Sequence, residues 1–222
     1  MDTGGLLLAF TNPPADDEEA FNAWYDEEHA PARLGVPGIL SARRYISVGA
    51  DGPRYMACYD LETPDVLQRP EYVRLLAGQS DRERRMLARL PLLDKRILRT
   101  LIGGDEWTAD PPYQVMVALD PPSGAEADFV TWYGAEHRPS LLRISGCRRV
   151  RLFEQVEGSG PRLMALHEME SESVASTDAY QALLSELASR CRQPPEPRLF
   201  KLLRSCAALR TPSVATALSS GP

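Results

Sequence analysis

The chain has 222 residues, of which 43% are hydrophobic and 25% are charged, a composition typical of folded globular proteins. Its formal net charge of −6 disfavours a surface that binds nucleic acid or an anionic membrane. The apolar run Leu6–Phe10 is too short to span a bilayer and lacks the flanks of a signal peptide, so we expect a cytoplasmic protein. The length suits two small domains of roughly 100 residues each.

The first half of the chain alternates between strand-like and helix-like segments. Leu6–Thr11 is a short apolar strand, and the acidic residues from Asp16 onward start a helix in which large side chains recur at helical spacing. Pro31 disfavours helix at the residue before it, so His29 is expected in the last turn. The remaining predicted elements are a hairpin of strands Arg43–Val48 and Arg54–Leu61, a helix that begins over Pro64–Leu76, and a strand Lys95–Ile102. The order β-α-β-β-α-β is that of the ferredoxin-like fold.

The second half of the chain repeats the first. The pattern Phe-x-x-Trp-Tyr-x-x-Glu-His-x-Pro stands at 21–31 and again at 129–139, an offset of 108 residues. The same offset aligns 52–57 with 160–165. After the second helix Arg96 matches Arg198 at an offset of 102, which places an insertion of six residues near the charged stretch 80–89. We therefore predict an internal duplication.

Each copy is expected to form one domain, copy 1 over 1–104 and copy 2 over 113–206. The Gly- and Pro-containing segment 105–112 suits a linker, and the Ser/Thr/Ala/Pro-rich segment 207–222 a loosely ordered tail. A four-stranded sheet with helices on one face leaves its other face bare, and an apolar bare face needs a partner. We therefore predict an α+β fold in which two tandem ferredoxin-like (βαββαβ) domains pack sheet to sheet as a barrel.

The cysteines give no sign of a disulfide framework or a zinc site. None of the four forms a C-x-x-C pair, and none recurs at the repeat spacing: Cys58, Cys147, Cys191 and Cys206. We expect thiols in a reducing compartment.

The repeated motif, followed by Val36-Pro37-Gly38 and Arg43-Arg44-Tyr45, resembles the dimeric α+β barrel superfamily. The resemblance covers about 5–102 and 113–204 and is closest to the EthD-like branch with its tandem relatives. It implies an intrachain dimeric α+β barrel with a pocket between the helices and the sheet of each unit. The superfamily includes cofactor-free cyclases, lactone isomerases, dehydratases, decarboxylases and small oxygenases, and also haem-binding members.

The motif histidines His29 and His137 are the first candidates for catalysis, because an imidazole transfers protons near neutral pH. A helix C-terminus would favour the imidazolium form of His29. Tyr25 and Tyr133 lie one turn earlier and would contact the same ligand. The competing interpretation is that both histidines form a capping or core hydrogen bond and so maintain the fold in each copy.

The remaining motif residues are candidates for substrate binding. Trp24 and Trp132 lie in the apolar stripe and are expected in the core more than in a binding platform. Glu28 and Glu136 fall in the same stripe, where an unpaired carboxylate is costly. For both glutamates, a structural ion pair and a position facing the pocket are equally compatible with the sequence. The predicted partners are Arg43 or Arg54 for Glu28, and Arg151 or Arg162 for Glu136.

The copies differ at one informative strand position, where Tyr59 aligns with His167. Strand alternation places Tyr59 on the face opposite Asp60. If the Tyr59 face contacts the helices, Tyr59 lines a pocket with His29, and His167 lines one with His137. The His137–His167 pair would then be the better proton-transfer site, although an ordinary exposed strand position is the alternative for His167.

These observations favour a cofactor-independent enzyme that transfers protons on a small hydrophobic carbonyl or aromatic metabolite by cyclisation, dehydration, isomerisation or decarboxylation. The alternatives are a non-catalytic metabolite-binding protein, haem binding through a motif histidine, and cofactor-free oxygenation. No metal site and no nucleic-acid or membrane partner is expected, and both a monomer and a homodimer remain open.

Overall fold

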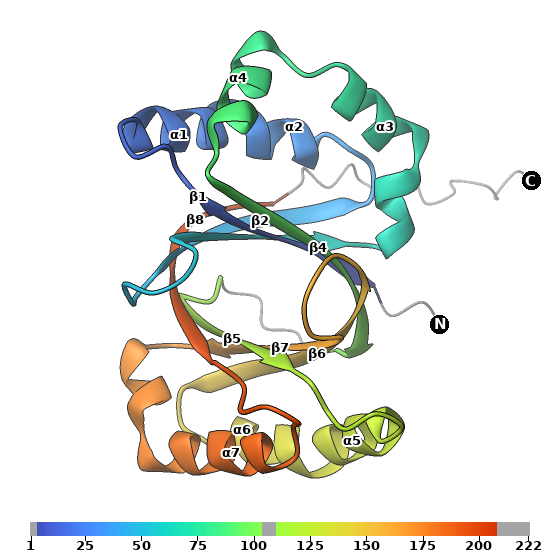
Figure 1. Cartoon of the computed structure of the whole chain (residues 1–222), viewed down its shortest axis with the longest axis vertical. Helices are drawn as coiled ribbons and strands as arrows, with labels where there is room; N and C mark the ends of the chain where they lie inside the picture. Colours follow the sequence, from blue (N-terminus) through green and yellow to red (C-terminus); the bar gives the residue numbers. More distant parts are fainter. Residues whose placement is uncertain (1–3, 104–109, 208–222) are drawn as a thin grey trace, which may run out of the picture.

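The computed structural model describes residues 4–103 and 110–207 (Figure 1). Most of the expected linker and tail lies outside these residues. The strands are β1 (Gly5–Asn12), β2 (Ile39–Ser47), β3 (Tyr55–Leu61), β4 (Leu92–Ile102), β5 (Tyr113–Leu119), β6 (Cys147–Glu157), β7 (Leu163–Met169) and β8 (Arg198–Ala207). The helices are α1 (Glu18–Trp24), α2 (Ala30–Leu34), α3 (Pro70–Ala77), α4 (Asp81–Arg89), α5 (Glu126–Trp132), α6 (Arg138–Leu142) and α7 (Asp178–Ser189).

The strands form one closed antiparallel barrel in the order β1-β3-β2-β8-β5-β7-β6-β4. The first half contributes β4-β1-β3-β2 and the second contributes β8-β5-β7-β6, and the pairs β2–β8 and β4–β6 join the two at their edges. Figure 1 shows α1–α4 on one side of the barrel and α5–α7 on the opposite side. The mixed α+β fold and the barrel are confirmed. Edge pairing leaves no strand of the barrel unpaired, which removes the aggregation hazard of an open sheet.

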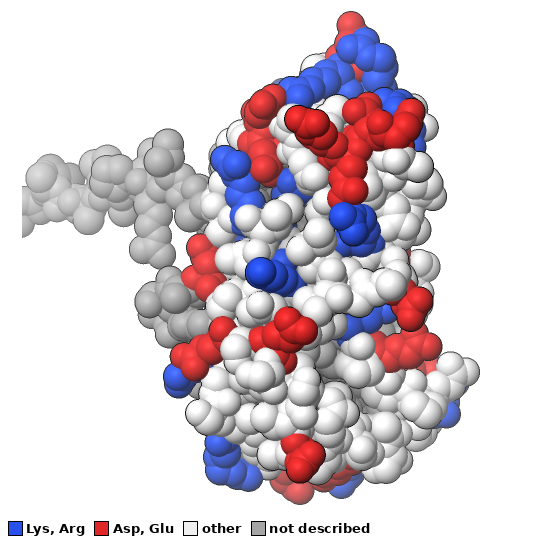
Figure 2. Space-filling model, turned by 90° about the vertical axis from the view of Figure 1, so that its left-hand side faces the viewer, with Lys and Arg blue, Asp and Glu red and all other residues white. Residues whose placement is uncertain are grey.

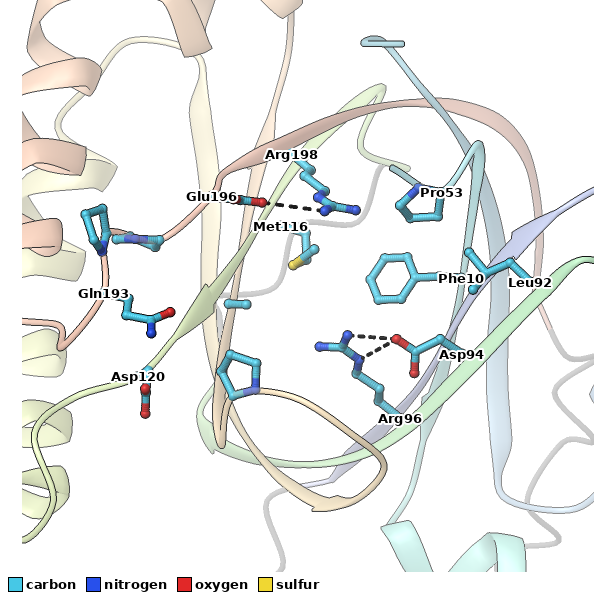
Figure 3. Close-up of a pocket in the computed structure, with 14 residues that line it drawn as sticks. Phe10, Pro53, Leu92, Asp94, Arg96, Met116, Asp120, Gln193, Glu196 and Arg198 are labelled. Atoms are coloured by element: carbon cyan, nitrogen blue, oxygen red, sulfur yellow. Dashed lines mark hydrogen bonds and ion pairs between the residues drawn. The ribbon is translucent and has the colours of Figure 1, made fainter. Parts of the chain in front are cut away.

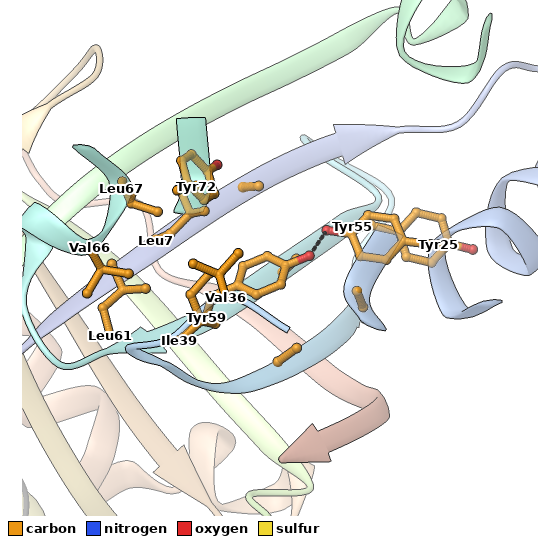
Figure 4. Packing of buried hydrophobic residues seen from close by; sticks show 14 of the residues in the cluster. Leu7, Tyr25, Val36, Ile39, Tyr55, Tyr59, Leu61, Val66, Leu67 and Tyr72 are labelled. Carbon is orange, nitrogen blue, oxygen red and sulfur yellow. Dashed lines mark hydrogen bonds between the residues drawn. The ribbon is translucent and has the colours of Figure 1, made fainter. Parts of the chain in front are cut away.

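Strand alternation divides the core into a barrel interior and two outer layers. On β1, Leu6, Leu8 and Phe10 point into the barrel, while Leu7 and Ala9 pack against the helices. The hydrophobic cluster inside the barrel, called the interior cluster below, contains residues from both halves of the chain. Each outer layer packs separately under its own helices, and Figure 4 shows the one in the first half.

Buried ion pairs occupy one end of the barrel interior. Arg151 donates to Asp60 and to Glu168, each over 2.8 Å, and Arg43 donates to Asp60 over 2.7 Å. Arg149 forms two further bonds to Glu168. Burial opposes ionisation of Asp60, but Arg151 and Arg43 outweigh it and hold its pKa well below the usual range. This network fills the end opposite to Phe10.

The first helix continues past Pro31, so the predicted end at His29 is wrong. A π-helical turn over Tyr25–His29 separates α1 from α2, and the N–H of Ala30 bonds to the carbonyl of Tyr25. A proline lacks an N–H and clashes with the carbonyl four residues before it in a regular helix. The wider turn relieves that conflict and shifts the helical register by one residue. The second half repeats this turn over Tyr133–His137.

The predicted second helix is divided. Pro64–Gln68 forms a 3₁₀ turn, and α3 starts only at Pro70 because that proline keeps Arg69 extended. The charged stretch forms α4, capped by the Ser80 hydroxyl.

The surface carries mixed charges, as the composition predicts. Figure 2 shows acidic and basic side chains interspersed on the face in view. Within 4–103 and 110–207, no helix combines the length and apolarity needed to cross a bilayer.

Candidate functional site

A cavity of about 60 Å³ lies between the barrel and the helices of the first half. It brings together four of the predicted site residues, which are His29, Tyr25, Trp24 and Tyr59. Further lining comes from Leu7, Ala9, Thr11, Arg33, Tyr72, Leu76, Gln79, Leu87, Leu90, Leu93 and Lys95. The expected pocket between helices and sheet is therefore present in the first half.

His29 is 7% exposed and packs against two aromatic rings. Its ring centroid lies 4.4 Å from that of Trp24 and 4.6 Å from that of Tyr25. Its Nδ1 lies 3.2 Å from Oε1 of Glu83. Burial lowers the pKa of His29 to about 4, although the Glu83 hydrogen bond opposes this shift. The expected dipole-stabilised imidazolium is wrong, because the helix runs on and burial dominates.

Glu83 is a candidate site residue that the sequence interpretation missed. It lies on α4, is buried, and is also contacted by Arg33 Nη1 and Nη2 and by Gln79 Nε2, each at 3.4 Å. The hydrogen bond from His29 is the main reason that its pKa is lowered. A carboxylate at Glu83 fixes the His29 proton on Nδ1, which leaves Nε2 as the ring nitrogen that can accept a proton. The available signal was Ser80-x-x-Glu83, a helix-start pattern inside the insertion.

Two tyrosine hydroxyls meet beside this histidine. Tyr59 donates to the Tyr25 hydroxyl over 3.0 Å, from β3 to the π turn (Figure 4). Burial raises the pKa of both hydroxyls, so both are neutral donors near neutral pH. The Tyr59 face of β3 contacts the helices, which was the condition for Tyr59 to line a pocket with His29.

The second half arranges the equivalent residues differently. His167 is fully buried, with Nε2 2.8 Å from the Tyr133 hydroxyl and Nδ1 2.7 Å from the Tyr180 hydroxyl. Both ring nitrogens are occupied, and burial lowers the pKa of His167 to about 3. The exposed alternative for His167 is therefore wrong. A direct His137–His167 relay is not formed either, because the tyrosines take both nitrogens of His167.

His137 is enclosed without a hydrogen bond. Both of its ring nitrogens are buried and unpartnered among the described residues, and Glu186 approaches Nδ1 only to 3.8 Å. Its ring lies 4.9 Å from Trp132 and 5.1 Å from Tyr133, between centroids. Burial lowers the pKa of His137 to about 4. The helix-capping interpretation is wrong for both motif histidines, since both helices continue beyond them.

The predicted ion pairs of the motif glutamates are wrong. Glu28 accepts a hydrogen bond from Ser80 and lies 3.9 Å from Arg82, and Glu136 is exposed. The π turns explain this, because the shifted register turns these positions away from the apolar face.

The four arginines proposed as their partners bind other acids. Arg43 and Arg151 belong to the network inside the barrel. Arg54 pairs with Glu18, and Arg162 with Glu154. Arg43 and Arg151 are not among the residues that line the cavity beside His29.

The lining of the first-half cavity is more polar than the matching positions of the second half. At the repeat offset, Arg33 corresponds to Leu141, Thr11 to Leu119 and Gln79 to Leu187, all three leucines being fully buried. The polar side chains that contact Glu83 in the first half, Arg33 and Gln79, are thus replaced by buried leucines in the second half. The first half is the better candidate site.

Haem does not fit beside either motif histidine in this structure. The cavity at His29 is about 60 Å³, several times smaller than a tetrapyrrole requires, and the His137 side chain is 0% exposed. An iron atom could reach either imidazole only after aromatic neighbours moved.

Comparison with known proteins identifies the fold. No family model and no curated protein matches the sequence. Among solved structures, an anthrone oxidase-like protein has a TM-score of 0.65 at 11% identity, covering 93% of this chain and 94% of its own. A candidate monooxygenase from Fusobacterium nucleatum has a TM-score of 0.63 at 10% identity, covering 93% and 96%.

A chlorite dismutase variant from Candidatus Nitrospira defluvii, solved in complex with cyanide, has a TM-score of 0.61 at 12% identity, covering 91% and 92%. The chain shares the α+β barrel fold of these proteins. Sequence identities this low do not indicate that it shares their activities.

Proposed function

We propose that the first-half cavity is the active site of a cofactor-independent oxygenase that acts on a small aromatic or carbonyl compound with an acidic O–H or C–H bond. The buried His29–Glu83 pair, in which Nδ1 contacts Glu83 and the His29 side chain lines the cavity, carries this proposal. The solved neighbours described as oxidase-like and monooxygenase support oxygenation over lyase, isomerase or cyclase chemistry.

The proposed reaction begins with proton transfer. Neutral His29 accepts the substrate proton on Nε2, and the carboxylate of Glu83 stabilises the imidazolium that forms. The Tyr25 hydroxyl, which accepts the hydrogen bond from Tyr59, donates its own proton toward the substrate oxygen and stabilises its negative charge. The low pKa of His29 keeps the imidazole unprotonated at neutral pH, so the base is ready before substrate binds.

The substrate anion supplies the electrons. It transfers one electron to O₂, and the resulting radical and superoxide combine to form a C–O bond. The imidazolium returns its proton to the peroxide, which gives a hydroperoxide and restores neutral His29. Loss of water from a hydroperoxide at a CH carbon breaks the O–O bond and leaves a carbonyl. The balance is one CH₂ group and one O₂ converted to one C=O group and one water.

The substrate must be small, or the lining must move. A volume of about 60 Å³ is well below that of pockets for drug-sized ligands. Leu76 and Leu93 line the cavity and are 39% and 42% exposed, so they mark the side from which a substrate enters. The helices α3 and α4 would open on that side.

A second candidate uses the same residues without oxygen. Proton abstraction by His29 followed by proton return is an isomerase or lyase step, and the His29–Glu83 pair serves it equally well. Non-catalytic retention of a hydrophobic metabolite is the remaining option for this cavity.

For the chain as a whole we propose a tandem, EthD-like member of the superfamily. Its two ferredoxin-like copies would cover 1–104 and 113–206, and a cytoplasmic location fits this class. The matching strand orders of the two halves and the shared 108-residue offset support a duplication.

Oxygen uptake tests the proposal. The chain is assayed with a panel of single-ring phenols and 1,3-dicarbonyl compounds, under air and under argon, with product mass measured. His29→Gln should lower uptake by about 10²- to 10⁴-fold, the range for loss of a general base. The matched change His137→Gln should leave uptake near the wild-type value. If turnover persists under argon, the reaction does not use O₂ and the isomerase or lyase candidate is favoured. If the His29→Gln variant takes up oxygen at the wild-type rate, His29 is not the base.

A further inference from the structure

A second and larger cavity, of about 450 Å³, opens at the end of the barrel opposite to the buried ion pairs (Figure 3). Phe10 and Met116, which belong to the interior cluster, form part of its wall. The other lining residues come from β4, β5, β8 and the connecting loops: Pro53, Leu92, Asp94, Arg96, Ala118, Asp120, Pro161, Gln193, Pro194, Pro195, Glu196 and Arg198. The cavity has the size of small-molecule pockets and lies on the other side of the barrel wall from His29.

Two arginines point into this cavity from opposite halves of the chain. Arg96 on β4 and Arg198 on β8 occupy equivalent repeat positions, and Figure 3 shows both side chains directed at the space beside Phe10 and Met116. Gly52 in the β2–β3 hairpin makes room for Arg198, since a Cβ there would collide with its guanidinium, and Gly160 in the β6–β7 hairpin lies close to Arg96. Each arginine therefore packs under the hairpin of the other sheet edge.

The two guanidinium groups differ in how they are neutralised. Arg96 is 14% exposed and donates twice to Asp94 Oδ2, over 2.7 and 3.2 Å. Arg198 is 35% exposed and has one described ion pair, at 3.6 Å to Glu196, whose side chain is 84% exposed. Such a pair in solvent contributes little. The donors of Arg198 are therefore the ones available to a ligand.

The third acid of the lining does not compete for Arg198. Asp120 accepts a 2.6 Å bond from Arg192, which is outside the lining. Asp94 and Asp120 are each neutralised by an arginine, and Glu196 pairs with Arg198 only over 3.6 Å in solvent. Arg198 is therefore the cation that a ligand can reach, beside an apolar wall of aromatic, thioether and proline side chains. A weakly paired guanidinium at the mouth of an apolar cavity favours a single carboxylate, which can displace Glu196, over a neutral or cationic group.

We propose that this barrel cavity binds an organic monoanion, an aromatic or aliphatic carboxylate, with its carboxylate on Arg198 and its apolar body against Phe10 and Met116. The site is separate from the His29 cavity and does not depend on the function proposed there.

Three probes with one apolar body test the site by isothermal titration: 1-naphthoate, 1-naphthylmethanol and 1-naphthylmethylammonium. We expect 1-naphthoate to bind once per chain and the other two at least about tenfold more weakly, as for loss of a charged hydrogen bond. Arg198→Gln should remove this preference for the carboxylate. Lys201→Gln, on the same strand with an exposed side chain on the outer face, is the matched control and should retain it.

Two further variants locate the bound molecule. Ala118→Phe fills the cavity and should weaken binding of all three probes, while His29→Gln should leave 1-naphthoate binding unchanged. Equal binding of the alcohol and the carboxylate overturns the proposal. So does an Arg198→Gln variant that keeps the preference, a loss of binding in His29→Gln, or no binding of 1-naphthoate at about 10 mM.

Discussion

Replacing His137 with phenylalanine should make the protein less sensitive to mild acid. Burial holds the pKa of His137 near 4 in the folded chain, against 6.5 for an ordinary histidine. Between these two pKa values the unfolded chain binds a proton at His137 and the folded chain does not. The free energy of unfolding therefore decreases as the pH falls from 6.5 toward 4. At about pH 5 this one group costs about 2 kcal/mol of unfolding free energy relative to about pH 7.5. His137→Phe removes that cost and keeps the aromatic packing against Trp132.

The groups that face His137 do not cancel the effect. Glu186 lies 3.8 Å from Nδ1 but is half exposed, and Arg190 opposes the imidazolium. Urea unfolding of wild type and His137→Phe at the two pH values gives the difference directly. A Phe129→Leu variant, which changes packing without changing titration, should show the full wild-type loss. If His137→Phe loses as much stability as wild type between the two pH values, the imidazole is not held neutral by burial.

Two further predictions concern the barrel. Arg151→Met leaves Asp60 and Glu168 facing each other without their shared cation, and should lower the unfolding free energy by about 3 to 5 kcal/mol in urea titration; a change below about 1 kcal/mol would show that the network is not a buried one. Gly52→Ala places a side chain at a φ of +83° and against Arg198, and should cost about 1 to 2 kcal/mol, measured by thermal unfolding. Unchanged stability of this variant would refute the role given to the glycine.

The barrel was predictable because its pattern is strong and local. The period of two along Tyr55–Asp60 separates an outward Tyr59 from an inward Asp60, and the same alternation separates His167 from Glu168 at the repeat offset. Apolar residues on both faces of β1 then require a helix layer outside and a second sheet inside. These arguments use only neighbours in sequence and the repeat.

The site was harder to predict because two of its determinants are not local. The π turn shifts the register by one residue after Tyr25, so a regular helical projection places Glu28 in the core and misplaces it. Glu83 reaches His29 from 54 positions away in the chain, and no spacing rule links the two. A charged stretch normally indicates a solvated helix, and only the packing of α4 shows that one of its glutamates is buried.

The insertion and the substitutions around it act on the same histidine. The first half gains α4, which brings Glu83 to Nδ1 of His29, and it carries Arg33 at the position where the second half has Leu141. Arg33 and Glu83 would each be costly to bury alone, and together they form a pair that holds one imidazole in one tautomer. In the second half Leu141 fills the equivalent space, and His137 packs between aromatic rings. Both halves retain the histidine, but only in the first does a buried carboxylate lie within hydrogen-bonding distance of it. The proposed acid–base chemistry is therefore better supported in the first half.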